Sequence, residues 1–290
     1  MIATRPRSLL FVPGDRPERM EKALAYDVDV LILDLEDSVA PEAKAQARET
    51  IRAFLNREQR PIPLLVRVNA LTSGLIEEDI EAILPAGPDG IVLPKAEGSA
   101  SIEDLEKLLG EYGNDKLPVM PIATETPAAI FELGGYRHVA SRLFALTWGA
   151  EDLPAAIGAS AARDDNGAYT QPYQMARALA LFAAHAAGVA AIETVYPNFK
   201  DIDGLKACAA RARRDGFSGM MAIHPAQIAV INAAFQPTQA EIDWARQVIA
   251  AFDKNPEAGV IGLDGHMLDA PHLSRARAIL KSKRDQSTEP

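Results

Sequence analysis

Cysteine is almost absent from the sequence, and no hydrophobic run is long. The single cysteine, Cys208, excludes an intrachain disulfide, and nothing indicates an oxidising compartment. No apolar run is long enough to span a bilayer. The N-terminal stretch MIATRPRSLLFVPGD contains arginines, but its apolar run is too short for a signal peptide and ends in Pro-Gly. We therefore expect a soluble cytoplasmic protein with no membrane segment.

Basic residues are outnumbered by acidic ones, 30 against 40, which gives a net charge of −10. This balance, without any long basic run, argues against nucleic acid or an anionic membrane as a partner. A few local cations can still hold a small anionic ligand. The sequence also lacks a P-loop, a G-x-G-x-x-G motif, an H-E-x-x-H motif and paired C-x-x-C motifs.

What the chain does contain is a repeated alternation of apolar runs and helix-like segments. Its 290 residues suffice for one large domain or two small ones. The runs are nearly continuous in apolar residues, as in parallel strands that are buried on both faces. The strand candidates are RSLLFVP, VLILDLED, PLLVRVNA, GIVLPKA, VMPIATETP, LFALTWGAEDL, AAIETVYP and GMMAIHPAQ.

Helix signals lie between these runs. Asp15 and Thr126 are candidate caps, and Pro127 follows Thr126 at the first helical position. About eight strand-plus-helix units, with no break in composition, predict an α/β fold of the TIM (β/α)8 barrel type over residues 1–236. A doubly wound open sheet is the alternative.

Residues 237–290 follow the eighth unit and predict a helix–hairpin–helix extension. The segment PTQAEIDWARQVIAAF is a capped amphipathic helix, Asp264-Gly265 suits a tight hairpin turn, and HLSRARAILKSK forms the last helix. Because a lone hairpin is marginal in water, we expect this extension to act as a lid that packs on the barrel or on a neighbouring subunit.

Polar side chains gather where the strand candidates end. These residues are Asp34, Glu36, Asp37, Arg67, Asn69, Lys95, Glu125, Glu151, Asp152, Glu193, Tyr196 and His224. In a barrel, these ends share the face that holds the active site. Because a buried carboxylate is costly unless it is paired, hydrogen-bonded or bound to a cation, we expect a cation at this mouth.

The absence of any Cys and His cluster argues against zinc, copper and iron–sulfur sites. Carboxylates suit a hard ion such as Mg²⁺, with water and substrate oxygens completing the coordination. Glu125 and Asp152 end consecutive strands and are the best candidate pair of ligands. The alternative is that Asp152 caps the following helix and Glu125 pairs with an arginine.

Arg67 lies inside the apolar strand LLVRVNA, where an arginine must be paired or bind an anion. It either binds a substrate or forms an internal salt bridge with Glu36 or Asp37. For the acidic trio that includes these two residues and Asp34, the favoured interpretation is that one or two cap the following turn or orient a neighbour.

Two further groups of residues have weaker signals. Arg16, Arg19 and Lys22 lie at a predicted helix N-terminus, which favours a phosphate. They could equally form a solvated cationic face. His224 precedes a proline at a predicted helix start, and by itself it is expected to be a cap.

The motifs resemble, in order, the citrate lyase β-subunit-like (CitE-like) family of the HpcH/HpaI aldolase superfamily, which includes malyl-CoA and citramalyl-CoA lyases. The stretches that carry the resemblance are RSLLFVPGDRPERMEKA, LILDLEDSV, VRVNA, ETPAAI, GAEDL, TVYPNFKDIDGL, AIHPAQI and DGHMLDAP. They cover nearly the whole chain. The resemblance implies a TIM barrel, a trimer or dimer of trimers, a bound Mg²⁺ (or Mn²⁺) and a CoA-thioester substrate.

By motif position, Glu125 and Asp152 match the metal ligands of this family, and Arg67 matches its substrate-binding arginine. Asp269 matches a catalytic aspartate that reaches the site of a neighbouring subunit. Glu125 and Arg67 would also contact the substrate, together with the positions that match the CoA site, which are Phe11, Arg16, Lys22, Ile223 and His224.

Two positions depart from the pattern of the family. Family members often carry Lys at the position of Met220 and Asp at the position of Glu193. The first change removes a possible cationic contact with CoA, and the second would change the floor of the site.

The implied reaction is a retro-Claisen cleavage of a 3-hydroxyacyl-CoA, such as malyl-CoA, citramalyl-CoA or citryl-CoA, into acetyl-CoA and a 2-oxo acid. Mg²⁺ would chelate the hydroxyl and carboxylate oxygens of the substrate. Arg67 would meet the enolate and Asp269 would move protons. Glu36 and Asp37 would hold metal-bound waters or Arg67.

Four other functions remain open. The chain could be a thioesterase on malyl-CoA-like substrates, the β subunit of a citrate lyase complex that acts on an acyl-carrier protein, or a CoA-independent aldolase for hydroxy-keto acids. It could also be a non-catalytic scaffold. Arg16 and Lys22 argue against the aldolase, and the intact set of Arg67, Glu125 and Asp152 argues against the scaffold.

Overall fold

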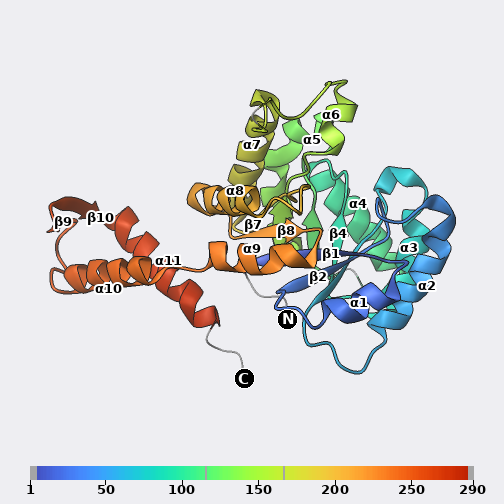
Figure 1. Cartoon of the computed structure of the whole chain (residues 1–290), viewed down its shortest axis with the longest axis horizontal. Coiled ribbons are helices and arrows are strands. Elements are labelled where there is room, and N and C mark those ends of the chain that lie inside the picture. Colours follow the sequence, from blue (N-terminus) through green and yellow to red (C-terminus); the bar gives the residue numbers. More distant parts are fainter. Residues whose placement is uncertain (1–4, 115, 166, 287–290) are drawn as a thin grey trace. The chain divides into compact units, whose positions relative to one another are not determined.

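The computed structural model describes residues 5–114, 116–165 and 167–286 of the chain. The chain divides into two compact units, the first ending at Ala234 and the second beginning at Phe235 (Figure 1). Among the described helices, none is both long and apolar enough to cross a membrane.

The first unit is a barrel of parallel strands. Its strands are β1 (Ser8–Pro13), β2 (Val30–Asp34), β3 (Leu64–Arg67), β4 (Gly90–Leu93), β5 (Val119–Pro121), β6 (Ala145–Thr147), β7 (Ala190–Glu193) and β8 (Gly219–Ala222). They follow the order β5-β4-β3-β2-β1-β8-β7-β6. Parallel bridges from Val119 to Leu143 and from Ile122 to Thr147 join the two ends of this order. The predicted TIM barrel is therefore confirmed, and the open sheet is wrong.

Helices surround the strands. They are α1 (Pro17–Ala23), α2 (Lys44–Leu55), α3 (Ile76–Ile83), α4 (Gly98–Glu111), α5 (Pro127–Glu132), α6 (Asp152–Ala156), α7 (Gln171–Ala187), α8 (Ile202–Asp215) and α9 (Ile228–Phe235). Short 3₁₀ turns are η1 (Pro41–Ala43), η2 (Leu71–Ser73), η3 (Leu84–Ala86), η4 (Leu133–Arg142) and η5 (Pro225–Gln227).

The predicted helix caps are confirmed at α5 but not at α1. The Thr126 hydroxyl accepts a hydrogen bond from the Ala129 N–H, and Pro127 begins α5 as expected. At α1 the cap position is Arg16, with no side-chain capping bond, so Asp15 does not cap this helix. Pro17 alone, with its fixed φ, marks the start of α1.

Alternation along the strands decides which side chains enter the barrel. Val30, Ile32 and Leu65 belong to the buried core inside the barrel wall. Side chains two residues apart share one face of a strand. The same inward register therefore continues to Asp34 at the end of β2 and to Arg67 at the end of β3. The apolar core thus gives way to charged groups at the C-terminal ends of the strands.

The second unit contains α10 (Gln239–Asp253), β9 (Val260–Leu263), β10 (His266–Asp269) and α11 (Ala270–Gln286). The hairpin is antiparallel, and Asp264 and Gly265 both have positive φ at its turn, as the Asp-Gly pair predicted. Ile261 and Leu268 pack with residues of α10 and α11 in a small core. The hairpin therefore has apolar support within its own unit, which the sequence had not indicated.

Candidate active site

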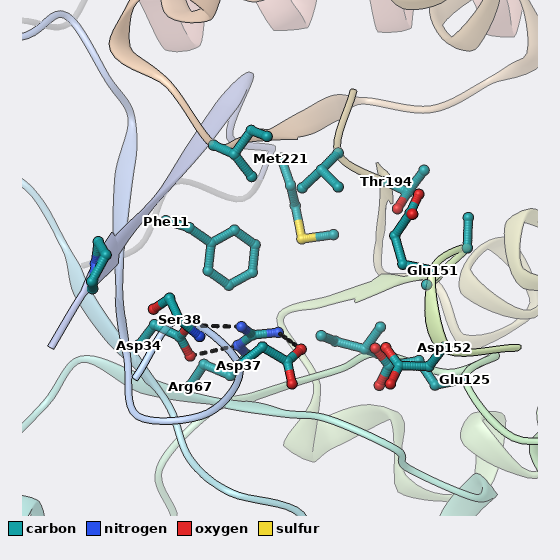
Figure 2. Close-up of a pocket in the computed structure, with 16 residues that line it drawn as sticks. Phe11, Asp34, Asp37, Ser38, Arg67, Glu125, Glu151, Asp152, Thr194 and Met221 are labelled. Atoms are coloured by element: carbon teal, nitrogen blue, oxygen red, sulfur yellow. Dashed lines mark hydrogen bonds and ion pairs between the residues drawn. The ribbon is translucent and has the colours of Figure 1, made fainter. Parts of the chain in front are cut away.

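A pocket of about 330 Å³ opens at the C-terminal ends of the barrel strands. Figure 2 shows Arg67 with Asp34 and Asp37 on one side, and Glu125 with Asp152 on the other. The lining residues are Phe11, Pro13, Asp34, Asp37, Ser38, Arg67, Ile122, Glu125, Gly149, Ala150, Glu151, Asp152, Thr194, Val195, Met221 and Ile223. The pocket is therefore apolar on the side of β1 and β8 and acidic on the side of β5 and β6.

Arg67 is held mainly by Asp34. Its Nε and Nη2 donate to the two carboxylate oxygens of Asp34 at 2.6 and 2.7 Å. The two residues face each other in the register of β2 and β3, which makes this two-pronged contact possible. Burial disfavours the charge of Asp34, but the Arg67 guanidinium outweighs it and holds the pKa of Asp34 below its usual range.

The remaining contacts of Arg67 are with Glu36, Asp37 and Phe11. Nη1 lies 3.0 Å from Glu36 Oε2 and 3.3 Å from Asp37 Oδ2. The guanidinium also stacks over the Phe11 ring, 4.7 Å from its centre. A guanidinium has five N–H donors, of which Asp34 takes two and Asp37 a third, so Arg67 keeps donors for an oxygen in the pocket.

Asp34 also organises the turn that follows β2. Its oxygens accept hydrogen bonds from the N–H groups of Glu36, at 2.9 Å, and Ser38, at 3.1 Å. One member of the acidic trio therefore both caps a turn and orients a neighbour, as the favoured interpretation of the sequence held. The alternative drawn from the sequence, an internal salt bridge of Arg67 with Glu36 or Asp37, is confirmed with both residues, and Asp34 is a third and closer partner.

Lys95 connects the two sides of the pocket. Its ammonium lies 2.6 Å from Glu36 Oε1 and 3.3 Å from Asp152 Oδ1, and its backbone N–H donates to Glu125 Oε2 at 2.6 Å. Burial lowers the pKa of Lys95, but the contact with Glu36 raises it by more. Lys95 therefore stays positively charged.

Glu125 lies in a strongly acidic environment. Its side chain is buried, and burial raises its pKa to about 8, helped by the charges of Asp152 and Glu36. Burial likewise raises the pKa of Glu36. For Glu36 the effect of burial exceeds that of two cationic partners, Arg67 and Lys95, whereas Glu125 receives, among the described residues, only the Lys95 N–H.

Close packing fixes Glu125 beside the β6 end. A Cβ atom at Gly149 would lie 2.5 Å from Glu125 Cγ, so only glycine fits there. The Thr124 hydroxyl donates to the Gly149 carbonyl and accepts from the Gly149 N–H, at 2.9 and 3.1 Å. These bonds tie the two strand ends that carry Glu125 and Asp152.

Glu125 and Asp152 fit a divalent cation with oxygen ligands. Both line the pocket, and burial raises the pKa of Glu125, so a positive charge beside it would favour its ionised form. Within the described residues, no group of three or more His, Cys, Asp or Glu side chains forms a complete metal site. Mg²⁺ commonly takes only one or two carboxylates and completes its octahedron with water and substrate oxygens, so two ligands suffice.

Asp152 does not cap the helix that follows it, as the alternative had proposed. It is the first residue of α6, and the cap position is Glu151, with no side-chain capping bond. In the described part of the chain Glu125 forms no ion pair with an arginine, and its hydrogen-bond donor is the Lys95 N–H. Both side chains are therefore open to a ligand in the pocket.

The predicted CoA-contacting residues divide between the pocket and its surroundings. Phe11 and Ile223 line the pocket, and Ile223 is partly exposed at its mouth. His224 caps η5 by accepting a bond from the Ala226 N–H, and its ring stacks on Phe199. The remaining two, Arg16 and Lys22, are exposed on α1 and do not line the pocket.

Asp269 belongs to the second unit. Its carboxylate lies 2.6 Å from His272 Nδ1, and this hydrogen bond holds the pKa of Asp269 below its usual value. Glu36 is buried behind the pocket and does not line it.

The two departures from the family pattern both lie away from the pocket. Met220 is fully buried, while its neighbour Met221 lines the pocket. Glu193 accepts from Trp148 Nε1 and from Arg177 Nε, between the barrel wall and α7. Glu193 does not line the pocket itself, but it accepts from the N–H of Thr194, which does, so an effect of this departure on the site stays a prediction.

Sequence reasoning assigned no role to Lys95, although it noted its place at a strand end. The left-handed backbone of Lys95, with φ of 51°, brings its N–H and its ammonium onto two different carboxylates. Nothing in the local sequence GIVLPKA signals this conformation.

Comparison with known proteins gives one family. The model of the HpcH/HpaI aldolase/citrate lyase family matches residues 7–225. The chain is 35% identical to a citrate lyase subunit beta-like protein of Mycobacterium tuberculosis, over 97% of this chain and 96% of the other. It is 34% identical to citrate lyase subunit beta of Escherichia coli, covering 94% and 92% of the two chains. A mitochondrial citramalyl-CoA lyase of Rattus norvegicus is 34% identical, covering 94% and 85%.

Solved structures agree in fold. The protein CitE of Mycobacterium tuberculosis, in complex with magnesium, acetoacetate and coenzyme A, matches with a TM-score of 0.82 and 34% identity, over 96% of this chain and 97% of the other. The citrate lyase beta subunit from the same organism, complexed with oxaloacetate and magnesium, has a TM-score of 0.72 and 33% identity, covering 82% and 100%. Magnesium is thus present in structures of homologues.

Proposed function

Because the chain belongs to the HpcH/HpaI aldolase/citrate lyase family, we propose that it cleaves a carbon–carbon bond in a 3-hydroxyacyl-CoA thioester such as malyl-CoA, citramalyl-CoA or citryl-CoA. The observation that carries this proposal is the pairing of an arginine and two carboxylates across one pocket. Arg67 lies on one side, and Glu125 and Asp152 lie on the other (Figure 2). Homologues with this family assignment are carbon–carbon lyases that act on CoA thioesters.

Glu125 and Asp152 would hold Mg²⁺ or Mn²⁺. When bound, the ion would supply Lewis acidity to the hydroxyl and carboxylate oxygens of the substrate. Glu125 must then be ionised, although its pKa is about 8 without a metal. A divalent cation next to it would lower that pKa, which couples metal binding to loss of a proton.

The reaction moves one proton off the hydroxyl of the substrate and one onto carbon. As the hydroxyl loses its proton, its carbon–oxygen bond becomes a carbonyl and the adjacent carbon–carbon bond breaks. The electron pair of that bond enters the thioester as an enolate. Arg67 would stabilise the negative oxygen of this enolate with the guanidinium N–H groups that its carboxylate partners leave free. Protonation of the enolate carbon then gives acetyl-CoA, beside the 2-oxo acid.

Asp269 is the proposed proton-transfer residue, contributed by the second unit of a neighbouring chain. Its carboxylate is partly exposed and is held ionised by His272. Glu36 and Asp37 would keep Arg67 in place, as their contacts with Nη1 indicate. Arg16, Lys22 and His224 are proposed to contact the CoA outside the pocket lining.

The proposed homo-oligomer, a trimer or dimer of trimers, has support in exposed apolar side chains. Met175, Leu179 and Phe182 are exposed at spacings of four and three residues on α7. That spacing places them on one face of the helix. A second copy of the chain that covered this face would remove apolar area from water.

One experiment tests the reaction itself. The purified protein is incubated with Mg²⁺ and, separately, malyl-CoA, citramalyl-CoA and citryl-CoA, and products are identified by mass. A lyase yields acetyl-CoA and a 2-oxo acid. A free hydroxy acid with CoA would instead show a thioesterase. No turnover without added partner subunits would favour a citrate lyase β subunit that acts on a carrier protein.

A second experiment tests the metal. EDTA should abolish activity and Mg²⁺ or Mn²⁺ should restore it. Glu125→Gln should remain folded but lose metal affinity, because an amide oxygen is a much weaker ligand for a hard cation. Full activity of this variant at limiting Mg²⁺ would remove Glu125 from the ligand set.

Mixed oligomers test the role of Asp269. Asp269→Ala and Glu125→Ala should each be inactive, for different reasons. If Asp269 acts in a neighbouring chain, unfolding and refolding the two variants together creates some sites with both groups intact. These sites should recover part of the wild-type activity. Verified mixing with no recovery would place Asp269 in its own barrel or outside catalysis.

A further inference from the structure

Lys95 has an unusual backbone. Its φ of 51° is one of two positive values at non-glycine residues in the described part of the chain. A left-handed conformation at such a residue is strained and persists only where the surroundings impose it. Here local contacts offset the strain. The same turn directs the Lys95 N–H to Glu125 Oε2, 2.6 Å away, and directs the side chain toward other carboxylates.

The ammonium of Lys95 lies between the two halves of the acidic cluster. It is 2.6 Å from Glu36 Oε1, on the Arg67 side, and 3.3 Å from Asp152 Oδ1, on the side of the proposed metal. Lys95 itself does not line the pocket. It therefore contacts these carboxylates from behind and leaves the volume in front of them to a ligand.

Charge counting shows why this contact matters. The described cluster has five carboxylates and two cations that pair with them. The carboxylates are Asp34, Glu36, Asp37, Glu125 and Asp152, and the cations are Arg67 and Lys95. Asp34 and Asp37 pair with Arg67, and Glu36 pairs with both cations. Of these two cations, only Lys95 contacts Glu125 and Asp152.

We propose that Lys95 is a positioning residue that serves as the resident cation of this carboxylate cluster and sets how tightly Glu125 and Asp152 bind a divalent cation. This proposal rests on the metal site of the proposed function. The ammonium holds the carboxylates together when no ion is bound, and it repels an ion that enters. When an ion binds, Asp152 either contacts both the ion and Lys95 or loses its contact with Lys95. In the second case Lys95 keeps its contact with Glu36.

Electrostatics gives the direction of the effect. Like charges repel more strongly in a partly buried site than in water, because the effective dielectric constant there is lower. The repulsion between Lys95 and a divalent ion is twice the repulsion between Lys95 and a singly charged ion at the same distance. Removing the ammonium should therefore strengthen metal binding, even though it also removes the contact that Lys95 makes with the metal ligand Asp152.

A purely structural role predicts a different result. If Lys95 only holds Asp152 in place, its removal misplaces a ligand and weakens metal binding. If it only stabilises the fold, its removal lowers the melting temperature equally with and without metal. The two readouts, metal affinity and melting temperature, separate these roles without measuring activity.

The test measures the dissociation constant of Mn²⁺, by electron paramagnetic resonance, and of Mg²⁺, by calorimetry, on full-length protein without substrate. The variants are Lys95→Met, which keeps the length of the side chain, and Lys95→Arg, which keeps its charge. Lys107→Met is the matched control, since Lys107 pairs with Asp104 on the surface of α4.

We expect Lys95→Met to bind both ions about tenfold or more tightly and to melt at a lower temperature in EDTA than the wild type. Added Mg²⁺ should raise its melting temperature by more than it raises that of the wild type. Lys95→Arg should stay near the wild type, and Lys107→Met should be unchanged. If Lys95→Met proves insoluble, Lys95→Gln replaces it with the same expectation.

Unchanged or weaker metal binding by Lys95→Met would overturn the proposal. So would a tenfold gain in Lys107→Met, which would show a general charge effect. If the wild type itself binds neither ion, it is the proposed metal site that fails, and the two failures are thus distinguishable.

Discussion

Two buried carboxylate networks lie close together in the barrel and differ in how completely they are satisfied. Behind the β2 and β3 ends, Asp79 is fully buried and accepts from Arg48 Nε at 2.7 Å. Its other oxygen accepts from the Asn69 N–H and Nδ2, at 2.7 and 2.6 Å. At the mouth, by contrast, Glu125 has one hydrogen-bond donor among the described residues, the Lys95 N–H, and a pKa raised to about 8.

The difference distinguishes a carboxylate that stabilises the fold from one that is available to a ligand. Asp79 has donors on both oxygens, so it ties α3 to α2 and to the loop after β3 and has nothing left to offer a ligand. Glu125 is buried against its own electrostatic preference, which is what a site prepared for a cation requires. Asn69, which the sequence placed with the mouth residues, belongs to the first network.

The largest effect should come from breaking the satisfied network. Asp79→Ala leaves the Arg48 guanidinium buried beside a void, and we expect the free energy of unfolding to fall by about 3–5 kcal/mol. Denaturant unfolding measures it, and the folded fraction should keep its turnover. The exposed pair of Asp104 and Lys107 is the control, since Asp104→Ala should cost under about 1 kcal/mol. A loss that small at Asp79 would contradict the comparison.

Arg67→Lys should reverse that pattern, with a small effect on stability and a large one on rate. An ammonium cannot reproduce the two-pronged contact with Asp34 or the flat face over Phe11. We expect turnover to fall roughly 10²-fold, as when an oxyanion donor is removed. Steady-state kinetics measures it. Unchanged turnover with a higher KM would assign Arg67 to ground-state binding of the substrate.

The pH dependence of metal affinity sharpens the comparison further. Below pH 8 the metal-free Glu125 carboxyl is mostly protonated, so an entering ion must displace a proton. Affinity should therefore rise about tenfold per pH unit up to about pH 8 and level off above it. Calorimetry in two buffers of different ionisation enthalpy should show about one proton released per Mg²⁺ at pH 7 and almost none at pH 9. Equal release at both pH values would show that another group titrates.

The smallest effect is expected at a second satisfied carboxylate, Glu193. It accepts from Trp148, from Arg177 and from the Thr194 N–H. Trp148→Phe removes one donor of three while two remain, so we expect a loss of about 1 kcal/mol in the free energy of unfolding. Denaturant unfolding checks this value. A loss near that of Asp79→Ala would mean that the remaining donors do not compensate.

Much of the barrel could be predicted from the sequence because burial leaves a local record. Apolar runs such as LILDL and LLVRV mark strands covered on both faces, and Thr126-Pro127 marks a helix start. Polar residues that end these runs mark the mouth. The cap at Asp15 was predicted wrongly, because the chain before α1 turns so that no side chain meets the free N–H groups.

The sequence by itself determined the strand-and-helix repeat, the hairpin turn at Asp264-Gly265 and the kinds of groups that meet at the mouth. Each depends on neighbours along the chain. Only the tertiary structure decided that Asp34 is the closest partner of Arg67, that Glu193 anchors the wall, and that Lys95 joins both sides of the pocket. These pairings depend on strand register and on one left-handed residue, which bring together groups far apart in the chain.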